Sequence, residues 1–152
     1  SPDLYIHGVG NLMTSIAGCC QPLPGEPILG YVTSGRGVSI HREDCAKLLR
    51  LRAREPQRIL QVSWGGEPKG VYPVAVTVEA YDRAGLLRDI STAIDREGIN
   101  IAAINSRFRD YHGERIFVMD LDLEVTGLDP LSRLLAKLQQ VPNIIEVRRV
   151  ER

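Results

Sequence analysis

Long apolar runs are absent from the 152-residue sequence. No stretch of about 18 apolar residues occurs, which excludes a membrane-spanning helix, and no basic start followed by an apolar core marks a secretory signal. The cysteines number only three, and two of them are adjacent, so the sequence does not describe a disulfide framework. These absences make the cytoplasm the expected compartment.

An excess of charge of one sign and the common catalytic motifs are also missing. Lys+Arg and Asp+Glu both number 19, so bulk electrostatics indicates no particular partner. There is no phosphate loop ending in Gly-Lys-Ser/Thr, no Gly-x-Ser-x-Gly elbow and no His-Glu-x-x-His. The chain begins Ser1-Pro2-Asp3 without an initiator Met, as expected of a segment of a longer protein or of a processed one.

What is present is typical of a soluble globular protein with two parts. A hydrophobic content of 43% and a charged content of 25% allow folded cores. Residues 63–70 read Ser-Trp-Gly-Gly-Glu-Pro-Lys-Gly, and three glycines with a proline indicate a turn or linker. We therefore expect a first domain at 1–64, a linker at 65–70 and a second domain at 71–152.

The second part shows strand and helix patterns in a regular order. The expected elements are a strand at 74–78, a helix from Leu86 stopped by Gly98, strands at 99–109 and 117–125, a helix with the stripe Leu131, Leu134, Leu135 and Leu138, and a strand at 144–150. This βαββαβ order predicts a four-stranded sheet covered by two helices, the ferredoxin-like arrangement. The fold class is therefore α+β.

The same order occurs in RNA-recognition modules, which stack bases on aromatic side chains of the sheet. Here the open face of the third strand would carry Ile116, Val118, Asp120, Asp122 and Glu124. Three carboxylates repel phosphate, and we expect Arg107 and Arg109 of the neighbouring strand to pair with them. Reading of RNA by this sheet is therefore not expected.

The first part is less regular. We expect a short helix at 11–17, a hairpin of strands at 28–33 and 38–41, a helix capped by Asp44 that runs to about Arg54, and a strand at 59–64. A module of this size is marginally stable without a metal, a partner or a packed neighbour.

Three thiols and an imidazole are the most unusual residues of the first part. A tetrahedral zinc site could be formed by these four side chains, Cys19, Cys20, His41 and Cys45. The spacing His-x₃-Cys is also ordinary for zinc ligands. Adjacent cysteines argue against it, because successive side chains diverge in extended backbone. Buried cysteines that act as small hydrophobes, or a reactive Cys–His pair, are the alternatives.

Two other groups of residues could bind a ligand. Lys47, Arg50 and Arg54 follow i, i+3, i+7 spacing on the expected helix, which suits either phosphate contacts or a solvated face. Residues 82–87 lie where a strand turns into a helix. Amides at that helix start could bind a carboxylate while Asp82 receives an amino group, or Asp82 could merely cap the helix.

Several motifs resemble those of one known family. Residues 8–13 (Gly-Val-Gly-Asn-Leu-Met), 19–25 (Cys-Cys-Gln-Pro-Leu-Pro-Gly), 35–42 (Gly-Arg-Gly-Val-Ser-Ile-His-Arg) and Asp44-Cys45 resemble the conserved-cysteine region of long RelA/SpoT-type enzymes, the bacterial stringent-response factors. Residues 82–90 (Asp-Arg-Ala-Gly-Leu-Leu-Arg-Asp-Ile) resemble the start of their C-terminal ACT domain. The likeness covers nearly the whole chain and is closer to the RelA branch than to the SpoT branch.

The resemblance implies a regulatory segment that is not itself an enzyme. The parent enzymes transfer pyrophosphate from ATP to GDP or GTP, and some also hydrolyse the (p)ppGpp product, with both active sites in an N-terminal half outside this chain. The cysteine region, also called a zinc-finger or ribosome-intersubunit domain, would bind ribosomal RNA on ribosomes stalled with deacylated tRNA. The ACT domain would relay regulation, dimerise through its sheet or bind branched-chain amino acids.

The resemblance also assigns roles by position. The metal-type residues would be Cys19, Cys20, His41 and Cys45. The amino-acid contacts would be Asp82, Arg83, Ala84, Gly85, Leu86 and Leu87, with Asn100 beyond them. The basic residues Arg36, Arg42, Lys47, Arg50 and Arg54 would contact ribosomal RNA.

Overall fold

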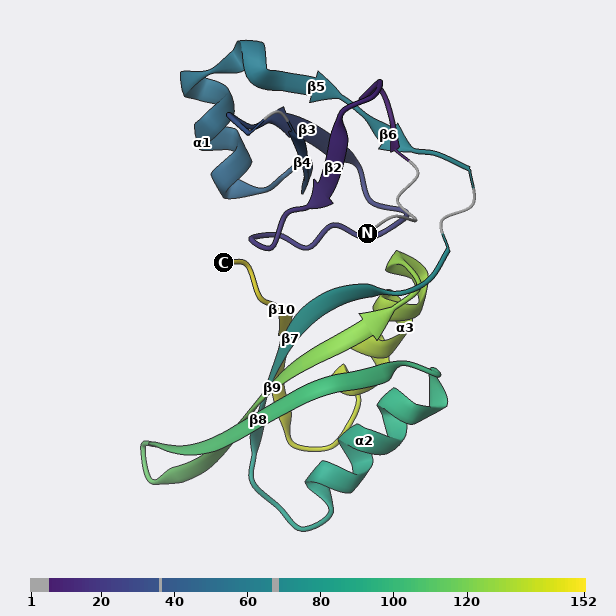
Figure 1. Ribbon diagram of the computed structural model, residues 1–152. Coiled ribbons are helices and arrows are strands. Elements are labelled where there is room, and N and C mark those ends of the chain that lie inside the picture. The colour runs from purple at the N-terminus through teal and green to yellow at the C-terminus, as the bar shows by residue number, and fades with distance from the viewer. Residues whose placement is uncertain (1–5, 36, 67–68) are drawn as a thin grey trace. The chain divides into compact units, whose positions relative to one another are not determined.

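The computed structural model describes residues 6–35, 37–66 and 69–152. The chain divides into two compact units (Figure 1). The first runs to Gly70 and also takes in Glu151–Arg152, and the second is Val71–Val150. Within the described ranges, no helix is both long enough and apolar enough to span a bilayer.

The first unit is built on a mixed four-stranded sheet. Its strands β2 (Met13–Ile16), β4 (Gly37–Arg42), β3 (Ile28–Val32) and β5 (Ile59–Gln61) lie side by side in that order. β2 is parallel to β4, and the other pairs are antiparallel, which confirms the expected hairpin of β3 and β4. A ribbon of β1 (Ile6–His7) with β6 (Ser63–Trp64), the helix α1 (Ala46–Arg54) and the 3-10 turn η1 (Pro56–Arg58) complete the unit.

Three expectations for this unit are wrong. The segment 13–16 is a strand and not a helix, because β4, distant in sequence, supplies hydrogen-bond partners that a local pattern does not reveal. Asp44 does not cap α1: the N-cap is Cys45, and the Asp44 carboxylate accepts a hydrogen bond from Arg42 at 2.9 Å instead. The segment 59–64 is two strands, β5 and β6, which pair with different partners.

Both faces of the first sheet bury side chains. Neighbouring residues of β3 point to opposite faces, so Leu29 joins one cluster and Ile28 the other. The first cluster consists of Ala17, Cys20, Leu29, Cys45 and Leu48, and the second of Ile28, Val38 and Ile40. Two cysteines are therefore part of the core on the face that α1 covers.

The second unit has the predicted βαββαβ order. Its elements are β7 (Tyr72–Tyr81), α2 (Leu86–Arg96), β8 (Asn100–Tyr111), β9 (Glu114–Val125), α3 (Leu128–Gln139) and β10 (Ile144–Arg149). The strands form an antiparallel sheet in the order β10-β7-β9-β8, and both helices cover one face of it (Figure 1). The α+β fold class is confirmed.

The two faces of this second sheet differ in chemistry. Fully buried side chains from β7, β9 and both helices form the core: Val74, Val76, Val78, Met119, Leu121, Leu123, Ile90, Ile94, Leu131, Leu134 and Leu138. Leu135, expected in the same stripe, is only half-buried. On the open face Arg107 pairs with Asp120 as predicted, whereas Arg109 pairs with Glu79 of β7, 3.3 Å away, and not with a β9 carboxylate.

Candidate functional site

The four predicted metal-type residues come together in the first unit. Cys19 and Cys20 lie in the turn after β2, His41 lies near the end of β4, and Cys45 immediately precedes α1. Their ligand atoms all lie within 4.8 Å of one another. Only Cys19 is partly exposed, and the other three residues are buried.

The separations of these atoms fit a tetrahedral ion. Thiolate and imidazole ligands at ordinary zinc distances, arranged tetrahedrally, lie about 3.8 Å apart for two sulfurs and about 3.5 Å apart for sulfur and nitrogen. The Sγ of Cys19 is 3.9 Å from that of Cys20 and 3.6 Å from that of Cys45. Nδ1 of His41 lies 3.4 Å from the Cys19 sulfur and 3.8 Å from the Cys20 sulfur. The cluster could therefore hold a metal ion.

The objection from adjacent cysteines does not apply to this backbone. The amide of Gln21 donates to the carbonyl of Ala17 at 3.0 Å, so Cys19 and Cys20 lie inside a single helical turn. Successive side chains in such a turn are rotated by about 100°, whereas those of a strand point to opposite faces. Gln21 leaves the turn with a positive φ of 47°. Both sulfurs can therefore face one point.

Groups around the cluster orient its ligands. The backbone amide of Arg42 donates to the Cys20 sulfur at 3.3 Å. Ser39 Oγ lies 3.0 Å from Nε2 of His41, which leaves Nδ1 facing the sulfurs. Such contacts fix ring orientation in metal sites. Sequence reasoning missed Ser39, although its i, i+2 spacing to His41 places both residues on one face of β4.

The protonation state of the cluster also follows from its burial. Burial raises the pKa of the Cys20 thiol, and burial together with the neighbouring Cys45 raises the pKa of Cys19. Burial lowers the pKa of His41 and keeps its imidazole neutral, the form that binds metals. Without a cation, the Cys19 and Cys20 thiols are protonated at neutral pH. A divalent ion would displace protons, because the thiolate is the ligand.

The predicted basic residues fall into three groups. Lys47, Arg50 and Arg54 are exposed on α1, and no carboxylate of the described residues forms an ion pair with them. Arg42, in contrast, is engaged by Glu26 at 3.3 Å and by Asp44 at 2.9 Å. Arg36 lies outside the described residues. The face of α1 therefore carries the available positive charge, close in sequence to Cys45.

In the second unit, the turn from β7 into α2 forms part of a cavity of about 330 Å³. Its lining combines the predicted Asp82, Arg83, Gly85, Leu86 and Leu87 with Arg88, Ser106, Phe108 and Phe117. The last three residues come from β8 and β9, and the sequence could not place them there without the register of that hairpin. Ala84 does not line the cavity.

Two of these predicted residues already have protein partners. Asp82 lies 3.7 Å from the guanidinium of Arg115. Arg83 donates to the carbonyl of Pro142 at 3.1 Å and to the carboxylate of Asp89 at 2.9 Å, so it joins the turn to α2 and to the loop after α3. Asp82 is not the N-cap of α2: that position is Gly85, with φ of 78°.

Asn100 lies far from the turn within one chain. Asn100 is the first residue of β8, where it lies opposite Glu124 of β9 and donates a hydrogen bond to it. The turn follows Tyr81, which lies opposite Ile116 of β9. These two positions on β9 are roughly 26 Å apart along the strand. A single chain therefore does not assemble the full set of predicted amino-acid contacts.

Comparison with family models explains both units. A RelA/SpoT RIS domain model matches residues 4–65, and an ACT domain model matches residues 68–149. The chain belongs to the RelA/SpoT family. Its first unit is the RIS domain of that family, and its second unit is the ACT domain.

Relatives of this RelA/SpoT segment are much longer than the segment. The GTP pyrophosphokinase of Escherichia coli K12 is 44% identical over 147 residues, which are 97% of this chain and 20% of that protein. The GTP pyrophosphokinase of Streptomyces antibioticus is 38% identical over 98% of this chain and 17% of that protein. The chain thus spans about a fifth of the relatives' length. The crystal structure of the ACT domain from the Chlorobium tepidum GTP pyrophosphokinase aligns at 25% identity and a TM-score of 0.46, over 53% of this chain and 99% of that one.

Proposed function

We propose that this chain is the ribosome-binding regulatory region of a cytoplasmic GTP pyrophosphokinase. The parent would make (p)ppGpp with catalytic domains outside this chain, and the RIS domain would contact ribosomal RNA on ribosomes that hold deacylated tRNA. The observation that carries the proposal is the exposed face of α1, where Lys47, Arg50 and Arg54 lack acidic partners among the described residues. Such a face suits phosphate contacts that are independent of sequence.

A zinc ion at the cysteine cluster would support this surface. Cys45 is the N-cap of α1, so a bound ion would fix the residue from which the basic helix starts. Cys19, Cys20, His41 and Cys45 would be the four ligands, and Ser39 would orient the imidazole. The ion would act as a structural centre, because four protein ligands leave no open position for a substrate.

The test is a charge reversal on α1. Lys47→Glu, Arg50→Glu and Arg54→Glu together should abolish co-sedimentation with ribosomes. Each lost phosphate contact should also reduce the slope of log affinity against log salt by about 0.7 to 0.9. Arg88→Glu is the control, because that side chain is 78% exposed and lies in the ACT domain. Unchanged ribosome binding by the triple variant would refute the role of α1.

A second function, amino-acid sensing, is favoured by the cavity at the turn. A branched-chain amino acid could place its side chain against Phe108 and Phe117 and its carboxylate near the first amides of α2. Asn100 could join only from a second copy of the chain. β8 is an edge strand with Ile104, Phe108 and Tyr111 about half exposed. An antiparallel β8 pair about a twofold axis would bring the start of one strand to the end of the other.

The sensing proposal predicts a ligand-linked homodimer. Valine, leucine or isoleucine should give saturable heat in calorimetry of the full chain and should shift sedimentation toward a dimer. Ile104→Lys on the exposed edge should weaken both responses, whereas Lys69→Ala, outside the sheet, should change neither. A folded chain that gives no heat at millimolar amino acid would end the proposal.

A further inference from the structure

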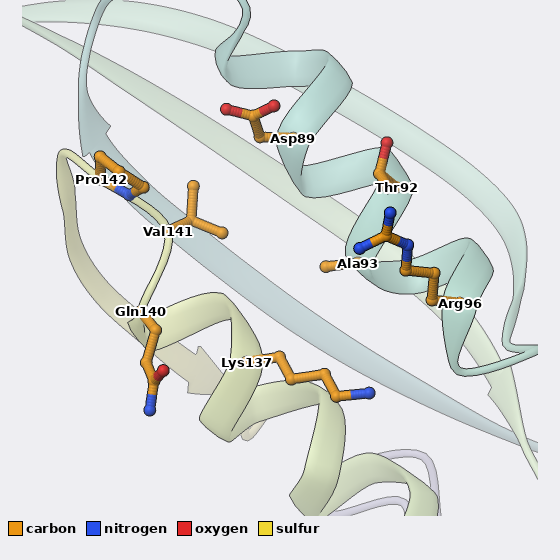
Figure 2. Close-up of a pocket in the computed structure, with 8 residues that line it drawn as sticks. All are labelled: Asp89, Thr92, Ala93, Arg96, Lys137, Gln140, Val141 and Pro142. Carbon is orange, nitrogen blue, oxygen red and sulfur yellow. The ribbon is translucent and has the colours of Figure 1, made fainter.

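A groove of about 470 Å³ lies between α2 and α3 of the ACT domain (Figure 2). Its lining comes from three successive turns of α2, from the end of α3 and from the loop that follows. The residues are Asp89, Thr92, Ala93, Arg96, Lys137, Gln140, Val141 and Pro142. Its volume lies within the range of about 300 to 1,000 Å³ that is usual for small-molecule sites. The groove shares no lining residue with the cavity at the turn described above, but two of its lining residues, Asp89 and Pro142, accept hydrogen bonds from Arg83 of that turn.

The charges around the groove leave it positive. Asp89, the one acid among the lining residues, is already held by Arg83 at 2.9 Å and by Arg88 at 3.5 Å. Lys137 shares a single carboxylate, that of Glu97, with Arg133. Arg96 has no acidic partner in the described part of the chain. A bound anion would therefore not have to displace an existing ion pair of Arg96.

The polar and apolar parts of the lining suit a ligand that has an anionic group and an apolar body. Arg96 offers a planar fork of donors, Lys137 a compact ammonium and Thr92 a hydroxyl, and all three project from the helices that flank the groove (Figure 2). A guanidinium with additional donors suits the several oxygens of a phosphate group. Ala93, Val141 and Pro142 supply apolar surface beside these donors. Such surface would cover a ring or a short hydrocarbon body.

We propose that the α2–α3 groove binds a small phosphate monoester, with its phosphate at Arg96 and Lys137 and its apolar body against Ala93, Val141 and Pro142. The groove is in a different domain from the basic face of α1, and it shares no lining residue with the cavity of the sensing proposal, which it contacts through Arg83. A ligand there would join α2 to the α3–β10 loop, which Arg83 already holds through Pro142. Occupancy would stabilise the packing of the two helices.

The test is a titration of the full chain followed by amide shifts in nuclear magnetic resonance. Phenyl phosphate should shift the amides of Thr92, Ala93, Arg96 and Val141 in a saturable way, with half-saturation in the millimolar range. Inorganic phosphate should bind more weakly because it lacks the ring, and benzoate should bind more weakly because a carboxylate offers fewer oxygens. Equal saturation by benzoate would overturn the assignment to phosphate.

Variants then test the residues themselves. Arg96→Gln should weaken phenyl phosphate about tenfold, as expected for loss of a charged hydrogen bond. Arg109→Gln is the matched control, because it removes the same charge from the same domain but on the open face of the sheet, beside Glu79. Circular dichroism checks that both variants are folded. Absence of saturable shifts at the groove amides, or equal weakening by both variants, would overturn the proposal.

Discussion

The two domains of this chain differ in the residues that fill their cores. The RIS domain places Cys20, Cys45 and His41 among its buried residues, and its two hydrophobic clusters are small. The ACT domain has strands of up to 12 residues and a continuous aliphatic core under two helices. On the zinc proposal, the stability of the RIS domain depends on an ion at its centre. A domain with a sufficient apolar core needs no ion.

The largest expected effect is therefore unfolding of the RIS domain when the proposed ion is removed. On the zinc proposal, a strong chelator or Cys45→Ser should unfold that domain, because structural zinc sites contribute on the order of 10 kcal/mol to folding. Trp64 is the only tryptophan and lies in this domain, so its fluorescence reports the transition. Far-ultraviolet circular dichroism should retain the ACT signal.

Metal analysis provides the control for this prediction. The purified chain should contain about one zinc ion, and Cys19→Ser and Cys45→Ser should each lose it. A chain that is free of metal and yet shows an unchanged Trp64 transition would mean that the cysteines act as ordinary core residues.

The second largest effect should come from a substitution in the aliphatic core, which should destabilise only the ACT domain. Leu134→Ala removes a fully buried side chain and should cost about 3 kcal/mol. Leu135→Ala, on the same helix but only half-buried, should cost clearly less. Chemical denaturation followed by circular dichroism measures both. A shift of the Trp64 fluorescence transition as large as that of the ACT transition would show that the domains unfold together.

The same contrast explains what the sequence could predict. The order of strands and helices in the ACT domain can be predicted from the sequence, because these elements are long enough to show a clear hydrophobic period. Phe117, Met119 and Leu121, for example, alternate on one face of β9. In the RIS domain the strands have two to six residues. There the strand β2 was predicted as a helix, because its partner β4 is distant in sequence.

The candidate sites follow a similar rule. The metal-type residues could be named from their chemistry, but their convergence depends on the helical turn from Ala17 to Gln21, which residue type does not reveal. The separation of Asn100 from the turn depends on the register of β7, β9 and β8. Arg96 and Lys137 approach one groove only because α2 and α3 pack side by side on the sheet.

A smaller effect concerns the turn that begins α2. Gly85 has φ of 78°, a conformation that costs an alanine about 1 kcal/mol. A Cβ there would meet the flexible end of Arg88 at 2.9 Å. Gly98, with φ of 68° and nothing within 4 Å of its Cβ, is the matched control. If Arg88 moves aside freely, Gly85→Ala and Gly98→Ala should cost the same in denaturation of the ACT domain. A larger cost for Gly85→Ala would show that the turn is rigidly packed.

The smallest expected effect lies on the open face of the ACT sheet. The Thr77 hydroxyl donates to Asp120 at 2.7 Å, and this bond, followed by Arg107, lowers the pKa of the Asp120 carboxyl. Because the pKa of this carboxyl is lower in the folded state, the hydrogen bond stabilises the fold at every pH above the ordinary pKa of an aspartate. The contribution is lost as the pH falls through the pKa of the folded state. Thr77→Val keeps the shape of the side chain and should cost only about 0.5 kcal/mol at neutral pH, because water screens the partly exposed Asp120 carboxylate.

Titration of the Asp120 carboxyl by nuclear magnetic resonance measures this change directly. In Thr77→Val the pKa should rise toward its ordinary value but remain below it, because Arg107 still pairs with the carboxylate. Arg107→Gln should also raise the pKa, because the guanidinium both donates a hydrogen bond to the carboxylate and attracts its charge. A larger rise in Arg107→Gln would mean that ion pairing, rather than the buried hydroxyl, orders the open face. The Trp64 transition should not change in either variant, because the RIS domain contains neither residue.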